Sequence, residues 1–397
     1  MLEPAIVNGK PVRSSFLHPF KHSIGKEEID EVVDTLKSDW ITTGPKTFKF
    51  EEIFFEYVNS KYAIAVNSCT AALHLAVVAL GIGNGDEVIT TPYTFAATAE
   101  VVINSNAKPV FVDVEKDTYN IDPAKIEEKI TDKTKAIIVV HYAGHACEMD
   151  KIMEIAEKYD LYVIEDAAHA IGSKYKDQKI GSIGDATCFS FYATKNITTA
   201  EGGMITTNRG DLADKMRILS LHGISKDAWK RYSSEGSWYY EIAYSGYKYN
   251  MSDLQASIGI HQMKKLDQMQ KRREEIADMY NKSFGQIPQI TIPTVKSYAT
   301  HAWHLYPIQV NSDLLSINRN EFIEALKAEN IGTSVHFIPL HLHPYYKEKY
   351  GFKGDDFPNA ESLYKNEISL PIYPNMEDKD VEDVISAVKK IIDYYEV

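Results

Sequence analysis

The chain has 397 residues, of which 44% are hydrophobic and 25% charged, and this ordinary globular composition excludes a disordered or fibrous protein. Its formal charge is −13, and Lys and Arg form no cluster dense enough to neutralise a row of phosphates, so we expect no nucleic-acid partner. A single phosphorylated small molecule is compatible with this charge, because helix N-termini and backbone amides bind phosphate.

Neither an export signal nor a membrane span is indicated. The first residues carry Glu3 and prolines where a signal peptide needs a basic stretch and then an apolar run. The most apolar stretch, residues 63–82, is interrupted by polar side chains. The three cysteines, Cys69, Cys147 and Cys188, lie far apart and are typical of reduced thiols. We therefore expect a cytoplasmic protein with no membrane partner.

From residue 61 to residue 208, short β-rich runs alternate with helical stretches, which predicts an α/β fold with a mostly parallel sheet flanked by helices. The expected strands are Tyr62–Val66, Glu87–Thr91, Pro109–Val114, Lys135–His141, Leu161–Glu165, Ala186–Phe191 and Met204–Thr207. The expected helices are Thr70–Leu80, Phe95–Asn104, Asp122–Ile130, Glu148–Lys158 and Gly210–His222.

The second half of the chain follows a different pattern. Gly223–Tyr249 is rich in aromatic and small residues without periodicity and is interpreted as a long ordered loop, and Ser252–Phe284 as a long amphipathic helix. We expect a large domain of residues 1–265 and a smaller C-terminal α+β domain of residues 266–397. The latter's expected elements are strands His304–Val310 and Thr333–Pro339 and helices Arg319–Glu329 and Asp378–Tyr395.

Two residues indicate the chemistry. Asp166 ends a predicted buried strand, and Lys195 follows a later strand at the start of a Thr/Gly-rich turn. A buried lysine with a lowered pKa can form a Schiff base with an aldehyde, and a carboxylate can hold a pyridine nitrogen protonated. Both are requirements for pyridoxal 5'-phosphate (PLP). The pair alone leaves open that Asp166 is a turn residue and Lys195 a surface charge.

Two further strand ends carry matching features. Thr70 and Ala71 open a helix directly after a strand, where backbone amides can bind phosphate, although an ordinary helix cap would look the same. Phe95 follows another strand and can stack on a ring, although core packing would explain it equally well. Ligands of parallel sheets bind at the carboxyl ends of the strands, so these residues are expected to converge.

An ordered set of segments resembles the DegT/DnrJ/EryC1/StrS family of PLP-dependent nucleotide-sugar aminotransferases, and the likeness covers nearly the whole chain. The segments are Trp40–Lys46, Asn67–Ala76, Val114–Asp122, Ile164–Ser173, Phe189–Met204, Gly246–Gly259, His301–Ile308, Ile331–Tyr346 and Ile368–Pro374. The resemblance implies PLP-dependent transferase fold type I with a seven-stranded sheet.

The resemblance also implies a role for each matching residue. Lys195 would be the Schiff-base lysine and later the acid/base, Asp166 would pair with the pyridine nitrogen, and His169 would lie near the ring. Phe95 would stack on the ring. The phosphate would be held by Thr70, Ala71 and Ser190, and by Asn250 of the neighbouring subunit of an obligate homodimer; the sugar would lie near Thr42, Thr43 and His336.

The reaction implied is amino transfer from L-glutamate to a nucleotide-linked 4-keto sugar, with UDP as the nucleotide, in the branch that includes the UDP-4-amino-4-deoxy-L-arabinose enzyme. Phe95 and Tyr192 depart from that branch and argue against a pentose. The alternatives are a PLP-dependent sugar dehydratase or lyase, a 3-keto-sugar aminotransferase, and a sugar-sensing binding protein. Lys195 disfavours the first of these, because a dehydratase branch of the family has histidine at this position. We expect no metal site, since the pair His341 and His343 has no acidic or cysteine companion at ligand spacing.

Overall fold

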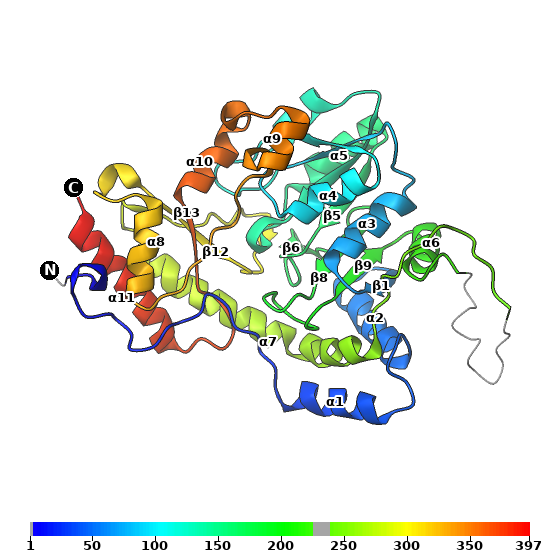
Figure 1. Ribbon diagram of the computed structural model, residues 1–397, viewed down its shortest axis with the longest axis horizontal. Coiled ribbons are helices and arrows are strands. Elements are labelled where there is room, and N and C mark those ends of the chain that lie inside the picture. The colour runs from blue at the N-terminus through cyan, green and yellow to red at the C-terminus, as the bar shows by residue number, and fades with distance from the viewer. Residues whose placement is uncertain (1–2, 225–238) are drawn as a thin grey trace.

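A computed structural model describes residues 3–224 and 239–397. A seven-stranded sheet lies at the centre of the larger part of the structure (Figure 1). Strand β9 runs antiparallel to its two neighbours, and the other pairs in the sheet are parallel. The mostly parallel sheet of fold type I is thereby confirmed. In spatial order the strands are β1 (Tyr62–Val66), β9 (Gly203–Thr207), β8 (Ala186–Ser190), β5 (Tyr162–Asp166), β4 (Thr134–Val140), β2 (Glu87–Thr90) and β3 (Lys108–Phe111).

Helices cover both faces of this sheet because successive strand side chains point to opposite faces. The covering helices are α2 (Pro45–Val58), α3 (Cys69–Ala79), α4 (Ala96–Asn104), α5 (Met149–Tyr159), α6 (Gly210–Ser220) and α7 (Asp253–Phe284), and α1 (Lys26–Lys37) packs on α7. In β4, Ile137 and Val139 pack with α2, α5 and α7, whereas Ala136 and Ile138 pack with α3, α4 and α6. Because β1, β2, β4, β5 and β8 run in the same direction, their carboxyl ends meet at one edge of the sheet.

The smaller C-terminal α+β part is built on an antiparallel sheet of β10 (Ile290–Thr291), β12 (Tyr306–Val310) and β13 (Glu367–Leu370). Its core includes side chains of α8 (Arg319–Ala328) and α11 (Asp378–Tyr395), and both chain termini lie beside these helices (Figure 1). Two more helices, α9 (Pro344–Tyr350) and α10 (Pro358–Asn366), pack against the β3 end of the large sheet. Strands β6 (Lys174–Tyr175), β7 (Gln178–Lys179) and β11 (Ala299–Thr300) form a third small sheet.

Helix α7 connects the two parts. Its Ser252 cap accepts a hydrogen bond from the Gln255 amide and begins the helix, and Leu266 and Met269 still pack in the core under the large sheet. Tyr280 and Phe284 pack instead in the C-terminal core. The domain boundary between residues 265 and 266 falls inside this helix and stays a prediction.

Two predicted elements are wrong. Asp122–Ile130 forms two short 3-10 turns, Pro123–Lys125 and Glu127–Lys129, because it has too few apolar residues at helical spacing to bury a face. The segment 333–339 is no strand but is joined to β13 by an isolated bridge between Ser334 and Ser369. There the amide of His336 donates to the side chain of Glu367.

Of the predicted loop Gly223–Tyr249, residues 225–238 lie outside the described residues. The described ends of the loop are joined by an isolated bridge between Ile224 and Ile242, and Lys248 forms a second bridge to Leu221, directly after α6. Within residues 3–224 and 239–397, no helix has both the length and the apolar composition needed to cross a bilayer.

Candidate active site

A cavity of about 620 Å³ opens at the carboxyl edge of the large sheet. It brings together side chains from the ends of β1, β2, β5 and β8 with a segment of the C-terminal part. The predicted residues that line it are Thr70, Phe95, Asp166, His169, Ser190, Lys195 and His336. Residues far apart in the sequence therefore share one cavity, as the parallel sheet requires.

Lys195 lies in the turn that follows β8, where its amide donates to the carbonyl of Tyr192 at 2.9 Å. Burial in the cavity wall lowers the pKa of Lys195 to about 8, although the negative charge of Asp166 opposes this shift. At neutral pH a useful fraction of such an amine is unprotonated and can act as a nucleophile or a base.

Asp166 is the last residue of β5, and its carboxylate faces the cavity. Its two oxygens accept hydrogen bonds from Thr98 Oγ1 at 2.8 Å and from the amide of Ala168 at 3.2 Å. Burial nevertheless raises the pKa of Asp166, against these bonds and the charge of Lys195. A protonated ring nitrogen at this carboxylate would supply a compensating charge, so the site fits PLP. The sequence did not reveal the role of Thr98.

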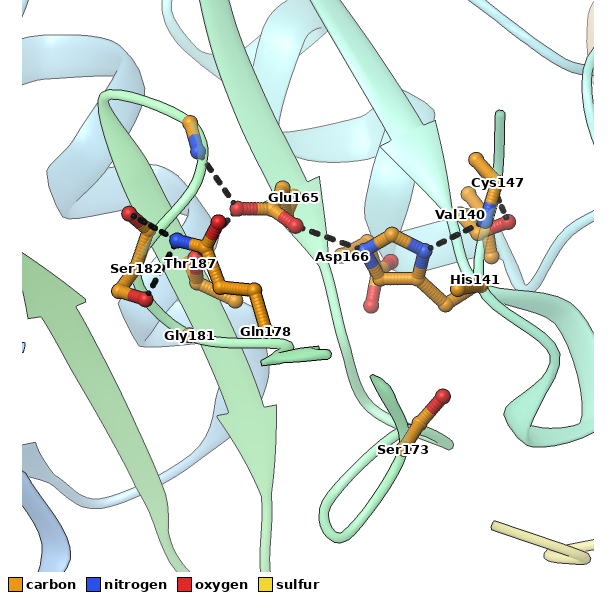
Figure 2. Close-up of polar contacts among 12 residues, drawn as sticks. Val140, His141, Cys147, Glu165, Asp166, Ser173, Gln178, Gly181, Ser182 and Thr187 are labelled. Atoms are coloured by element: carbon orange, nitrogen blue, oxygen red, sulfur yellow. Dashed lines mark hydrogen bonds and ion pairs between the residues drawn. The ribbon is translucent and has the colours of Figure 1, made fainter. Parts of the chain in front are cut away.

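Behind Asp166 lies a buried polar network that the sequence analysis missed (Figure 2). His141 Nε2 donates to Glu165 at 2.9 Å, while its Nδ1 accepts from the amide of Cys147 at 3.1 Å. The amide of His141 also donates to the carbonyl of Asp166 at 3.1 Å. This network ties the end of β4 to the end of β5.

Glu165 is stabilised as a carboxylate by this network. Its second oxygen accepts from Thr187 Oγ1 and from the amide of Gly184, each at 2.8 Å (Figure 2). Burial opposes ionisation, but these bonds and His141 prevail and lower the pKa of Glu165. An acid directly before Asp166 on a buried strand was the sequence signal that could have revealed the network.

His169 lies over the cavity between two aromatic neighbours. Its ring is nearly parallel to that of Phe337 at 5.9 Å, and the ring of His304 lies 4.3 Å away. The amide of Ala143 donates to His169 Nδ1 at 3.3 Å. Burial lowers the pKa of His169 well below its usual range, so the imidazole is neutral. His304, fixed by Asn196, was missed although it belongs to a segment that carried the family resemblance.

The expected phosphate residues gather around the start of α3. Thr70 and Ser190 line the cavity, and Ser68 Oγ accepts from the amide of Ala71 at 3.1 Å. The Ala71 amide therefore already serves the helix cap. Gly203 is needed here, since a Cβ at this position would lie 2.5 Å from the carbonyl carbon of Ser68. The first residue of β9 therefore lies directly against the backbone at the start of α3.

Phe95 stands directly before α4, and 64% of its side chain is exposed. Its ring lies 6.3 Å from that of Phe337 across the cavity mouth. An aromatic ring of this size with an uncovered face at a cavity can accept a flat ring by stacking. This arrangement also fits PLP.

Four predicted residues, Thr42, Thr43, Ala71 and Asn250, are not among the residues that line the cavity. Asn250 Nδ2 donates to Thr43 Oγ1 at 2.6 Å, and Thr43 Oγ1 donates to the carbonyl of Met251 at 2.5 Å. Asn250 also pairs with the end of β1 through a bridge to Val66. The predicted role of Asn250 needs a second subunit. This role and the predicted place of Thr42 and Thr43 near the sugar stay predictions.

No group of three or more His, Cys, Asp or Glu side chains suited to a metal ion occurs in the described part of the chain. His341 is buried, and His343 Nε2 faces the carbonyl of Ile338 at 3.3 Å. The two imidazoles therefore have separate surroundings.

Comparison with known proteins defines the class. The model of the DegT/DnrJ/EryC1/StrS aminotransferase family matches residues 22–389. The protein MJ1066 of Methanocaldococcus jannaschii is 66% identical to this chain, and the match covers 96% of this chain and 99% of MJ1066. The spore coat polysaccharide biosynthesis protein SpsC of Bacillus subtilis is 57% identical, over 96% of this chain and 98% of SpsC. The PLP form of the putative sugar aminotransferase Spr1654 of Streptococcus pneumoniae superposes with a TM-score of 0.89 at 36% identity, over 96% of this chain and 99% of that one; it is also known in a PMP form.

The chain belongs to the DegT/DnrJ/EryC1/StrS aminotransferase family. It is a PLP-dependent aminotransferase with the fold predicted from its sequence.

Proposed function

We propose that the enzyme transfers the amino group of L-glutamate to a nucleotide-linked 4-keto sugar, with UDP as the nucleotide, in the biosynthesis of a polysaccharide. The observation that carries this proposal is the shared cavity of Lys195 and Asp166, in which burial lowers the pKa of the lysine to about 8. The names of two relatives, a polysaccharide biosynthesis protein and a putative sugar aminotransferase, support a sugar as the acceptor.

When bound, PLP supplies an aldehyde that captures an amino group and a ring that withdraws electrons from the neighbouring carbon. Lys195 would take the proton from Cα of the amino donor on Nζ and pass it to C4′ of the cofactor within the same half-reaction. In the half-reaction with the sugar it would move a proton in the opposite direction, from C4′ to the sugar carbon that receives the amino group. Asp166 accepts a hydrogen bond from the ring nitrogen and keeps it protonated. The dry surroundings of this carboxylate strengthen that interaction.

The other predicted site residues bind or orient the reactants in this proposal. Phe95 stacks on one side of the cofactor ring, and His169 lies near the ring as a neutral imidazole that accepts or donates one hydrogen bond. Thr70, Ala71 and Ser190 hold the phosphate at the positive end of α3. His336 faces the region left for the sugar.

We further propose a homodimer in which Asn250 of one subunit completes the phosphate site of the other. Asn250 and Thr43 are hydrogen-bonded to each other outside the cavity of their own chain, which supports this arrangement. Thr42 and Thr43 remain assigned to the sugar site, near His336.

An absorption spectrum of the PLP-loaded enzyme before and after L-glutamate tests the first half-reaction. We expect a yellow cofactor band that glutamate bleaches, and UDP-linked 4-keto sugars should then restore it. A band that glutamate leaves unchanged would contradict the proposed donor. Restoration by 3-keto sugars alone would move the keto position to C3, and loss of a sugar hydroxyl without restored colour would indicate a dehydratase.

Lys195→Ala identifies the reacting amine. We expect this variant to fold, to lose the visible band of the lysine-bound cofactor and to lose turnover by at least about a thousandfold, because one group serves as nucleophile and proton carrier. The matched control is Lys151→Ala, which removes an exposed lysine of α5 paired with Glu148. Full turnover of Lys195→Ala would refute the central assignment.

A further inference from the structure

A buried carboxyl, a hydroxyl and an imidazole form a continuous hydrogen-bonded chain from the C-terminal sheet to the cavity. Glu367 and Ser369 are two residues apart on β13 and therefore point to the same side of the strand. Glu367 Oε1 lies 2.5 Å from Ser369 Oγ, which lies 2.9 Å from His336 Nδ1. The second oxygen of Glu367 accepts from the amide of His336 at 2.9 Å.

The outer end of this chain is His336 Nε2. His336 lines the cavity that also contains Lys195, and its Nε2 makes no hydrogen bond to any residue that the structure describes. Burial and the charge of Lys195 lower the pKa of His336 to about 4. The imidazole is therefore neutral near pH 7, and only one of its two nitrogens carries a hydrogen.

The inner end of the chain is isolated from water. Glu367 is fully buried, and burial raises its pKa to about 8 against the hydrogen bonds of Ser369 and His336 and the charge of Arg319. Arg319 donates to the Glu367 backbone carbonyl at 2.9 Å rather than to the carboxylate. The other titratable groups that face this carboxyl or His336 are Tyr93, Tyr119, Tyr142, His169, His304 and Lys195.

We propose that Glu367 and Ser369 are positioning residues that set the tautomer of His336, and thereby decide whether its Nε2 offers the sugar acceptor a hydrogen-bond donor or a lone pair. With Glu367 protonated, its O–H donates to Ser369 Oγ, whose O–H donates to His336 Nδ1, so Nε2 carries the hydrogen. With Glu367 ionised, Ser369 donates to the carboxylate and accepts from Nδ1–H, so Nε2 presents a lone pair.

The change between the two states is balanced. Loss of one proton from the chain converts the carboxyl to a carboxylate, Ser369 reverses its O–H, and the imidazole hydrogen moves from Nε2 to Nδ1 with no change in imidazole charge. Near pH 7 the donor form prevails, which suits the carbonyl or a hydroxyl oxygen of a keto sugar. We call this change of the His336 tautomer with the ionisation of Glu367 the switch. Its effect on binding of the sugar rests on the proposed function, whereas the tautomer change itself does not.

The switch can be observed directly by nitrogen NMR of the PLP-loaded enzyme labelled with 15N-histidine. Comparison with His336→Gln assigns the His336 signals. We expect the hydrogen to be on Nε2 at pH 6.5 and on Nδ1 at pH 9.5. In Glu367→Gln the tautomer should stay constant over this range, because an amide does not ionise. A wild-type tautomer that never changes would overturn the inference.

The kinetics of the two half-reactions test whether the tautomer of His336 affects reaction with the sugar. We expect both Glu367→Gln and Ser369→Ala to leave the bleaching by glutamate within about twofold. Near pH 7, Ser369→Ala breaks the chain and should lower kcat/KM for the sugar half-reaction about tenfold, the loss of one hydrogen bond. Glu367→Gln should stay within about twofold of wild type at this pH, because its amide donates to Ser369 Oγ as the protonated carboxyl does.

Lys195 has a pKa of about 8 in the same cavity, so wild type and the variants all share a step from this amine. The ratio of kcat/KM in Glu367→Gln to that in wild type should therefore be near one at pH 6.5 and rise about tenfold by pH 9.5, and Ser369→Thr should follow wild type. A ratio that does not change with pH would also overturn the inference.

The matched control is Glu329→Gln, which removes another fully buried carboxylate of the C-terminal part, one paired with Lys390. It should keep the tautomer change and the pH profile of wild type even if it unfolds at a lower temperature. If glutamate bleaches the enzyme but no keto sugar restores the colour, the proposed acceptor fails while the NMR result still decides the switch.

Discussion

At the scale of single residues, the active-site carboxylate Asp166 gives a direct prediction. Asp166→Asn cannot keep a ring nitrogen protonated, so we expect the half-reaction with glutamate to slow by about a hundredfold or more, with PLP still bound. Stopped-flow bleaching of the cofactor band measures this rate. Thr98→Val, which removes one of the hydrogen bonds to Asp166, should have a smaller effect, about tenfold. Equal rates in Asp166→Asn and wild type would exclude the proposed pairing.

The buried pair of His141 and Glu165 yields a prediction about stability. His141→Leu leaves Glu165 buried without its partner, so we expect the free energy of unfolding to fall by about 3 kcal/mol. The double variant His141→Leu/Glu165→Leu should lose less than the sum of the two single variants, since neither charge nor ring is left unpaired. Urea denaturation of the four proteins completes the cycle, and strict additivity would show that the contact contributes nothing.

The pH dependence of this pair has a definite sign. The pKa of Glu165 is lowered in the folded enzyme, so its contribution is fully present above the unfolded value of about 4.5 and is lost as the pH falls through the folded value. We therefore expect the stability difference between wild type and the double variant to be larger at pH 7 than in the acid range. A difference that grows on acidification would contradict the assigned direction.

At the scale of elements, the crossing of α2 and α7 depends on a glycine. A Cβ at Gly259 of α7 would lie 2.6 Å from Cζ of Phe50 on α2. Alanine favours a helix over glycine by about 1 kcal/mol, but we expect Gly259→Ala to lower stability by about 1–3 kcal/mol because both helices are tightly packed. Thermal unfolding measures this effect. Adding Phe50→Leu should recover part of the loss, and a more stable Gly259→Ala would show that the helices can separate at no cost.

At the scale of the whole molecule, the proposed shared site can be tested by mixing two inactive variants. Lys195→Ala lacks the amine proposed to react, and Asn250→Ala lacks the residue proposed to complete the neighbouring site. If Asn250 acts across a dimer, each mixed dimer contains one site with both residues intact. We expect turnover to rise after the two proteins are unfolded and refolded together, compared with each refolded alone.

Two controls define the outcome of that mixture. Wild type treated in the same way reports the yield of refolding, and sedimentation of each protein reports whether dimers are present. Dimers that form but show no gain in turnover would place Asn250 at its own subunit's site or at none.

Helix α7 couples the two halves of the molecule. Its 32 residues extend roughly 48 Å and contribute to both hydrophobic cores. Figure 1 shows it running from the region below the large sheet to α8 and α11. Tyr280 and Met263 on one rigid helix therefore fix how the C-terminal part, with His336, faces the cavity.

The sequence alone determined the α/β class, the strands of the large sheet and the family. Local patterns suffice to predict these features, because the spacing of apolar residues within a short segment distinguishes a buried strand from an amphipathic helix. It also placed Lys195 and Asp166 at strand ends, which a parallel sheet must bring to one edge. The sequence did not predict the short turns at 123–129. Asp122 as a cap and Pro123 as the first residue are equally suited to the start of an α-helix and of a 3-10 turn.

Only the tertiary structure decided which polar side chains meet in the interior. His141 and Glu165 come from neighbouring parallel strands, and Glu367 reaches His336 because segment 333–339 leaves the regular sheet pattern. Contacts of this kind join residues that are distant in the chain, and their pKa shifts come from burial, which has no local signature. The sequence therefore indicated the groups proposed to carry the chemistry, and the packing of the two parts determined their burial, their pKa shifts and their orientation.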